Sequence, residues 1–207
     1  YIHRVDPNIP IEEVAQTMQE FQKEGKILQW GLSEASAETI RRAHHVEPLA
    51  AVQSEYSIWW RELEKEVIPT LEELKIGLVA YSPLGRGCLT GKLTRDAIAS
   101  ENDNRAELPR FTEEAFKANQ VVLDLLQKIA NEKEATIAQV SLAWLLAQKD
   151  WIVPIPGTTK LRRIDENVGA TSIHFSKQEL NDINQAVDQL EIVGDRYNQE
   201  QNKRTGK

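Results

Sequence analysis

The chain has 207 residues, with 41% hydrophobic and 28% charged side chains, which is the composition of a globular protein of one or two domains. These values exclude a disordered chain and a collagen-like repeat, and no apolar run approaches the roughly 20 residues that span a bilayer. The 25 basic and 32 acidic side chains give a net charge of −7, which disfavours a nucleic-acid-binding protein.

The single cysteine and the first residues bear on the cellular location of the protein. Cys88 is the only cysteine, so no intrachain disulfide can form and a cytoplasmic protein is the simplest expectation. Residues Tyr1 to Asp6 contain neither a signal-peptide pattern nor an initiator methionine. We therefore expect that the start of the chain is cut and not natural, either because the molecule is a fragment or because this sequence lacks residues of the whole protein.

Helices are predicted where apolar residues recur with a period near 3.6. Val14, Met18 and Phe21 form one such stripe within 11–25, and Ser36 can cap a second helix. The remaining predicted helices lie at 62–74 with a break or kink at Pro69, from Thr112 to about 129, at 136–147, at 160–170, and from a capping box of Ser176 and Glu179 to about 190.

Short apolar segments alternate with these helices and are predicted to be strands. They lie near 1–5, 27–32, 49–53, 76–81 and 152–155. Short, nearly continuous apolar strands between amphipathic helices are typical of a parallel sheet that is buried on both faces. A doubly wound sheet needs a glycine-rich phosphate loop after its first strand, and none is present. Polar groups at the carboxyl ends of the strands favour a barrel instead.

One long segment has no clear periodicity. The stretch from Ser82 to Pro109 is polar and contains glycines, and it is too long for a simple connector in a compact domain. We expect it to act as a functional lid. Trp59 and Trp60, which follow the third predicted strand, either line an aromatic pocket or pack against the next helix.

Five segments at the strand ends carry a resemblance. They are HRVDP at 3–7, WGLSEA at 30–35, QSEYS at 53–57, YSPLGRG at 81–87 and PIPGTTK at 154–160. In order and content they resemble the aldo-keto reductase superfamily, and within it the branch of pyridoxal-reductase-like enzymes and potassium-channel β subunits. Members of this family fold as (β/α)8 TIM barrels and reduce aldehydes or ketones with NADPH.

The resemblance also implies which part of the barrel is present. The chain begins at the segment that is similar to the fourth barrel strand, so residues 1–194 correspond to the C-terminal five strand–helix units of one barrel domain. Residues 195–207 form a polar tail, which we expect to fray. The family's catalytic Asp, Tyr and Lys have no counterpart here. We therefore expect residues 1–207 alone to catalyse no measurable carbonyl reduction.

His3 is the one candidate catalytic residue. A lone histidine near a strand end is more often a packed residue, but the resemblance implies that it orients the carbonyl oxygen of the substrate. An imidazole suits this task because either ring nitrogen can donate a hydrogen bond. No group of His, Cys, Asp and Glu has metal-ligand spacing, so no metal site is expected.

The resemblance implies a binding site for NADP(H) built from the strand ends and the loops after them. A hydroxyl and an amide at the strand ends, Ser33 and Gln53, can match the nicotinamide carboxamide, although by spacing alone they only cap strands. Tyr81 would stack on the nicotinamide. The other residues that the resemblance assigns to the cofactor are Ser82, Pro83, Leu84, Gly85, Lys92, Arg105, Gly157, Thr159, Lys160, Arg163, Glu166 and Asn167.

Two details of this set refine the prediction. Lys160 and Arg163 carry positive charge suited to a 2′-phosphate, which favours NADPH over NADH, although they could equally lie on the solvated face of an amphipathic helix. Glu34 follows Ser33 where many family members have Asn, and its role is unassigned.

The predicted function is therefore that of a cytoplasmic, NADPH-dependent oxidoreductase that converts aldehydes or ketones to alcohols by hydride transfer. Its partner would be a small-molecule carbonyl substrate, with neither nucleic acid nor a membrane, and a homo-oligomer stays open. Two alternatives remain at this point. One is an NADP-binding regulatory or sensor barrel without significant turnover, and the other is an inactive barrel fragment.

Overall fold

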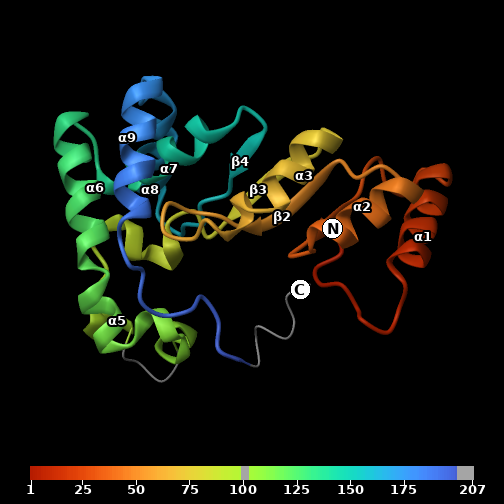
Figure 1. Ribbon diagram of the computed structural model, residues 1–207, viewed down its shortest axis with the longest axis horizontal. Helices are drawn as coiled ribbons and strands as arrows, with labels where there is room; N and C mark the ends of the chain where they lie inside the picture. Colours follow the sequence, from red (N-terminus) through yellow and green to blue (C-terminus); the bar gives the residue numbers. More distant parts are fainter. Residues whose placement is uncertain (99–102, 200–207) are drawn as a thin grey trace.

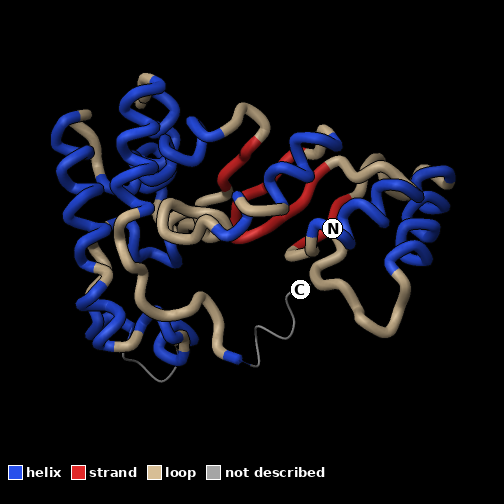
Figure 2. Tube along the Cα trace, viewed as in Figure 1, coloured by secondary structure: helices blue, strands red, loops and turns tan. Residues whose placement is uncertain are grey.

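The computed structural model describes residues 1–98 and 103–199. In that part of the chain, one sheet contains four parallel strands whose spatial order is their chain order (Figures 1 and 2). A doubly wound sheet would reverse this order at a switch point. The progressive order agrees with the consecutive strand–helix units of part of a (β/α)8 barrel. The strands are β1 (Gly31–Ser33), β2 (Ala51–Glu55), β3 (Gly77–Tyr81) and β4 (Ile152–Pro154).

Helices connect the strands and form two groups. The helices α1 to α3 lie towards one end of the sheet, and α6 to α9 gather at the other end (Figure 1). The α-helices are α1 (Ile11–Lys23), α2 (Ala37–Val46), α3 (Val67–Leu74), α4 (Arg95–Ile98), α5 (Glu113–Ala118), α6 (Gln120–Glu132), α7 (Ile137–Gln148), α8 (Leu161–Gly169) and α9 (Lys177–Asp188). Short 3-10 helices cover Glu62–Glu64, Gly85–Thr90, Asn104–Glu107, Pro109–Phe111 and Ala170–Ser172.

Local signals in the sequence set several of these helix ends. The Ser36 hydroxyl accepts a hydrogen bond from the Thr39 amide, which confirms the predicted cap of α2. Ser176 and Glu179 form the predicted capping box of α9. Gly25 follows the end of α1 with φ of 71°, the left-handed conformation that glycine adopts without strain.

Near the N-terminus, the structure has fewer and shorter strands than the sequence predicts. Residues 1–5 form no strand, because the ladder is reduced to one bridge between Ile2 and Leu32 before the chain bends at His3. Residues 27–30 also precede the strand, since β1 begins at Gly31. Leu28, within that predicted strand, is 88% exposed.

Two predicted helices are divided in the structure. The segment 62–74 breaks before Pro69, which lies inside the first turn of α3, where its missing N–H costs no helical hydrogen bond. The helix that begins at Thr112 ends at Ala118. Asn119 interrupts it with a non-helical ψ of 0°, and its side chain donates to the Val193 carbonyl and accepts from the Val193 amide, each over 2.9 Å.

The segment from Ser82 to Pro109 is more ordered than the sequence suggested. Its described residues form short helices, and Cys88, Leu89 and Ile98 are buried among them. The segment is therefore packed onto the barrel units along part of its length. Four residues of the expected lid, 99–102, lie outside the described residues.

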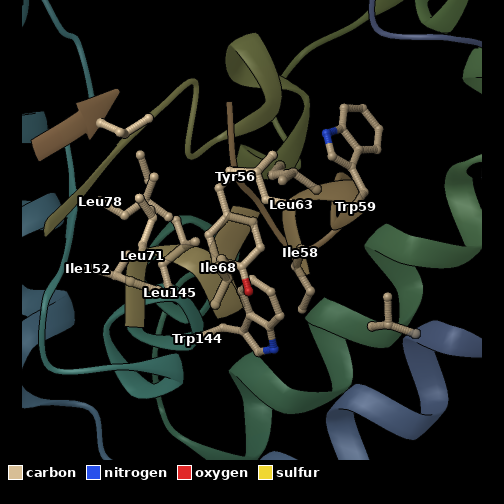
Figure 3. Close-up of a cluster of buried hydrophobic side chains, with 14 of the residues drawn as sticks. Tyr56, Ile58, Trp59, Leu63, Ile68, Leu71, Leu78, Trp144, Leu145 and Ile152 are labelled. Carbon is tan, nitrogen blue, oxygen red and sulfur yellow. The ribbon is translucent and has the colours of Figure 1, made fainter. Parts of the chain in front are cut away.

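The core lies between β2, β3 and the helices, and α7 runs through it. The apolar sequence of α7 predicts deep burial, and eight of its residues are buried. Trp144 of this helix packs against Tyr56 with a ring distance of 5.4 Å and donates from its indole N–H to Asn184 (Figure 3). This packing fixes the positions from which β2 and β3 present their carboxyl ends.

Candidate functional site

The carboxyl ends of the parallel strands bring the first group of candidate residues together. Ser33 of β1 pairs in register with Gln53 of β2, and Glu55 of β2 pairs with Tyr81 of β3. Gln53 and Glu55 are two residues apart and so face the same side of the sheet. Ser33, Gln53, Glu55 and Tyr81 therefore share one face.

Next to these strand ends, the loops after β3 and β4 enclose a cavity of about 360 Å³. This volume lies in the range of small-molecule sites. Nine of the residues assigned by resemblance line it, although they come from segments about 50 residues or more apart in the chain. They are Ser82, Pro83, Leu84, Lys92, Arg105, Gly157, Arg163, Glu166 and Asn167.

The cavity lining is rich in positive charge. Arg86, Lys92, Arg105 and Arg163 contribute cations, and Glu166 is the one carboxylate among the described lining residues. Lys92 lies 3.4 Å from Glu166. The three arginines of the lining suit a phosphorylated ligand, because guanidinium groups bind phosphate oxygens in a forked geometry.

Arg105 is held in place before any ligand binds. Its guanidinium donates to both carboxylate oxygens of Asp103 and to the Arg86 carbonyl over 2.9 Å. The Arg105 hydrogen bond lowers the pKa of Asp103, so this carboxyl stays ionised. The pair fixes the Arg105 side chain at the cavity wall.

Other assigned residues lie close to the cavity without lining it. Gly85 is buried beneath it with φ of 54°, and an added Cβ would lie 2.6 Å from the Trp59 ring, so only glycine fits there. Thr159 and Lys160 are exposed where the chain enters α8. Trp59 is buried against Gly85, and both Trp59 and Trp60 line a second cavity of about 570 Å³, so the structure does not decide between the pocket and packing interpretations of these residues.

The candidate catalytic residue, His3, is not among the residues that line the cavity. His3 is exposed at the bend that follows the bridge at Ile2. The adjacent Arg4 donates to the Ser33 hydroxyl over 3.2 Å and to the His3 carbonyl over 2.7 Å. Sequence reasoning missed Arg4, which connects the N-terminal segment to the strand ends.

Glu34, which had no assigned role, is the centre of a buried ion pair. Its φ of 56° turns the chain after β1, and its carboxylate accepts from the Glu55 amide over 2.9 Å. Both of its oxygens also accept from the Arg196 guanidinium. Burial is the largest effect and would raise the pKa of Glu34, but the hydrogen bonds and charge of Arg196, together with hydrogen bonds from the Glu55 amide and Tyr81, outweigh it and hold the pKa below the usual value.

Arg196 overturns the expectation of a tail that frays from residue 195. Its side chain is 9% exposed and that of Glu34 is 3% exposed, so the pair is inside the protein. Beside it, the hydroxyl groups of Tyr197 and Tyr81 are 2.9 Å apart. The composition of the tail could not reveal this, because a polar segment gives the same signal whether it frays or forms buried ion pairs.

Glu55 completes the charged group at the strand ends. Its carboxylate lies 3.5 Å from Arg86 and 3.7 Å from Arg196. Burial raises the pKa of Glu55, and the attraction of these arginines and of Arg110 only partly offsets that effect. Two carboxylates and three arginines thus surround the end of β2.

Two other kinds of feature are absent from the part of the chain that the structure describes. No cluster of three or more His, Cys, Asp or Glu residues has the geometry to hold a metal ion in that part of the chain. Among the described helices, none is both long and apolar enough to cross a membrane.

Comparison with protein families identifies one match. The model of the aldo/keto reductase family matches residues 1–188. Among curated proteins, the chain is 43% identical over 197 residues to probable aldo-keto reductase 1 of Glycine max, covering 95% of this chain and 57% of that protein. It is 45% identical over 199 residues to aldo-keto reductase str7 of Strobilurus tenacellus, covering 95% and 59%. The chain thus spans less than two thirds of each relative.

Solved structures give the same likeness. The glycerol dehydrogenase AKR11B4 from Gluconobacter oxydans matches with a TM-score of 0.84 and 26% identity, over 91% of this chain and 57% of that one. The thermostable aldo-keto reductase Tm1743, solved with the inhibitor epalrestat, matches with a TM-score of 0.68 and 29% identity, over 89% and 57%.

Proposed function

Because the chain belongs to the aldo/keto reductase family, we propose that the protein carrying it is an oxidoreductase that reduces aldehydes or ketones to alcohols with NADPH. The observation that carries this proposal is the cavity at the strand ends. Residues from the loop after β3, the loop after β4 and α8 converge on it, and its lining has more cations than carboxylates.

The residues present fit a phosphorylated dinucleotide. The N–H donors of Arg86, Lys92, Arg105 and Arg163 suit its phosphates, although the first three of these side chains also pair with carboxylates. An added Cβ on Gly157 would meet no atom within 4 Å, so the backbone there is open to a ligand. Lys160 and Arg163 would hold the 2′-phosphate that distinguishes NADPH from NADH. When bound, NADPH supplies the hydride.

The side chains at the strand ends have the task of orientation. Ser33 and Gln53 would bind the carboxamide of the nicotinamide, and the Tyr81 ring would fix which face of the nicotinamide meets the substrate. Burial raises the pKa of Tyr81, so its hydroxyl stays protonated and neutral. His3 would orient the carbonyl oxygen, in the role that the family resemblance implies.

Cofactor choice tests this proposal. In the whole protein, Arg163→Gln and Lys160→Gln should each weaken NADPH binding more than NADH binding, by about 1–3 kcal/mol for each charged hydrogen bond lost. The measurement is a titration of nucleotide fluorescence. The matched control is Arg162→Gln, since Arg162 neighbours Arg163 on α8 but is not among the cavity-lining residues.

The outcomes separate the proposal from its competitors. A selective loss of NADPH affinity in the Arg163 variant, with little change in the control, supports the assignment. Equal losses for both nucleotides would refute it. If the protein binds NADPH tightly but none of the aldehydes and ketones tested leads to NADPH oxidation, the result would favour the sensor function that the channel β-subunit resemblance suggests.

A further inference from the structure

The last described residues form a segment that crosses the strand ends, and we name residues 193–197 the C-terminal strap. In Figure 1 the chain leaves the lower end of α9 and runs past α5 towards the middle of the molecule. Asn119 binds both backbone groups of Val193, and Arg110 donates to the Gly194 carbonyl over 3.2 Å. The strap is therefore anchored at its start by the loop and helices before α6.

Gly194 allows the strap to pass close to this loop. Its φ is 86°, and an added Cβ would lie 2.6 Å from the Pro109 carbonyl oxygen and 2.8 Å from the Arg110 backbone. No other residue fits both the left-handed backbone and this close approach. The turn aims the next residues at the carboxyl ends of β1 and β3.

The far end of the strap is fixed by Arg196. Its guanidinium forms the buried two-pronged pair with Glu34 and also lies 4.9 Å above the Trp60 ring. Both partners are enclosed, so solvent screens their attraction only weakly. Glu34 is itself held by the Glu55 amide, so the anchor belongs to the sheet rather than to a mobile loop.

Arg196 thereby brings Tyr197 onto two residues of the candidate site. The Tyr197 hydroxyl is 2.9 Å from that of Tyr81, and the Tyr197 ring lies 4.9 Å from the guanidinium groups of both Arg86 and Arg196. Tyr81 is the proposed support of the nicotinamide, and Arg86 lines the cavity. One side chain of the strap thus touches the strand-end tyrosine and the cavity wall together.

We propose that Tyr197, held by the Arg196–Glu34 ion pair, is a positioning residue that fixes the Tyr81 ring and the Arg86 side chain for the bound dinucleotide. This inference rests on the proposed function, because it assigns Tyr81 and Arg86 to the nucleotide. Tyr197 itself need not contact the nucleotide. Its effect passes through a hydroxyl contact on one side and a stacked guanidinium on the other.

The test compares two tyrosine hydroxyls in the whole protein. Tyr197→Phe should raise the dissociation constant for NADPH about two- to tenfold, the effect of one lost hydrogen bond. The matched control is Tyr56→Phe, which removes a hydroxyl that donates to Glu64 over 2.7 Å in the core. The control should lower the unfolding midpoint and leave NADPH affinity unchanged. An unchanged affinity in Tyr197→Phe, or an equal loss in both variants, would overturn the proposal.

A double variant tests whether Arg196 acts through Tyr197. Arg196→Gln should weaken NADPH binding, Arg196→Lys should retain part of the affinity, and adding Tyr197→Phe to Arg196→Gln should weaken binding little further. Losses that simply add would show that the two residues act independently. If Arg196→Gln fails to fold, Tyr197→Phe alone still decides the role of the tyrosine.

A cofactor-free measurement separates this inference from the proposed function. In protein labelled with 3-fluorotyrosine, the signal lost in Tyr81→Phe identifies Tyr81. That signal should shift in Tyr197→Phe and Arg196→Gln but not in Tyr56→Phe, and an unmoved signal would contradict the inference. If the wild-type protein binds neither nucleotide, the proposed function fails, whereas the fluorine signal still decides whether Tyr197 fixes Tyr81.

Discussion

Replacing Arg196 with methionine should destabilise the fold strongly, because it leaves the Glu34 carboxylate buried without its partner. Breaking a buried ion pair on one side costs about 3–5 kcal/mol. Glu34 keeps its hydrogen bonds from the Glu55 amide and the Tyr81 side chain, which places the expected loss near the lower limit. We expect the free energy of unfolding to fall by about 3 kcal/mol at neutral pH.

The loss should shrink in acid. In the wild type, Arg196 holds the pKa of Glu34 below its usual value. The pair therefore stabilises the fold fully at a pH above the usual carboxyl pKa, and this stabilisation is lost as the pH falls through the lowered pKa. In Arg196→Met, unopposed burial raises the pKa of Glu34, and protonation then relieves the variant. The raised pKa of Glu55 rises further without Arg196, which acts in the same direction.

Urea unfolding of the whole protein at neutral and at mildly acidic pH measures both effects. A second variant, Glu34→Leu with Arg196→Met, is the control, since replacing both charges by apolar side chains of similar size is often close to neutral. It should recover most of the loss. Two results would refute the claim that the pair is buried and matched: a decrease in the free energy of unfolding of less than about 1 kcal/mol in the single variant, or no recovery of that free energy in the double variant.

Three further predictions concern other parts of the fold. The hydrogen bond from Lys133 lowers the pKa of Glu179 to about 2, so its stabilising contribution should disappear as the pH falls from 4.5 towards that value, and an NMR titration of this carboxyl measures it. Burial raises the pKa of Cys88 to about 11, so its thiol should resist alkylation in the native protein and react only after unfolding. Gly194→Ala should cost about 1–3 kcal/mol in urea unfolding, because its backbone is left-handed and closely packed.

Sequence periodicity predicted the strand–helix alternation because each element buries one face locally. The capping box of Ser176 and Glu179, the cap at Ser36 and the apolar circumference of α7 are all properties of neighbouring residues, and the structure confirms them. The cavity required the family resemblance as well. Lys92 and Glu166 are 74 residues apart in the sequence, and no local pattern relates them.

The predictions that failed concern partners distant in the chain. No residue near Asn119 in the sequence indicates that its side chain will form hydrogen bonds with the backbone of Val193, at the point where the predicted helix is divided. The structure has a single bridge, between Ile2 and Leu32, where a strand was predicted at 1–5. An apolar run in the sequence does not reveal how many residues of the adjacent strand will pair with it. Arg196 was predicted to belong to a frayed polar tail, because its partner, Glu34, lies 162 positions away in the sequence.

Carbonyl-dependent oxidation of NADPH by the whole protein tests the central claim most directly. We expect NADPH absorbance to fall only when a reactive aldehyde or ketone is added, and His3→Ala to lower kcat/KM by about a hundredfold or more while NADPH binding persists. A protein that binds NADPH but turns over none of a broad panel of aldehydes and ketones would contradict the account, as would a His3→Ala variant with unchanged turnover.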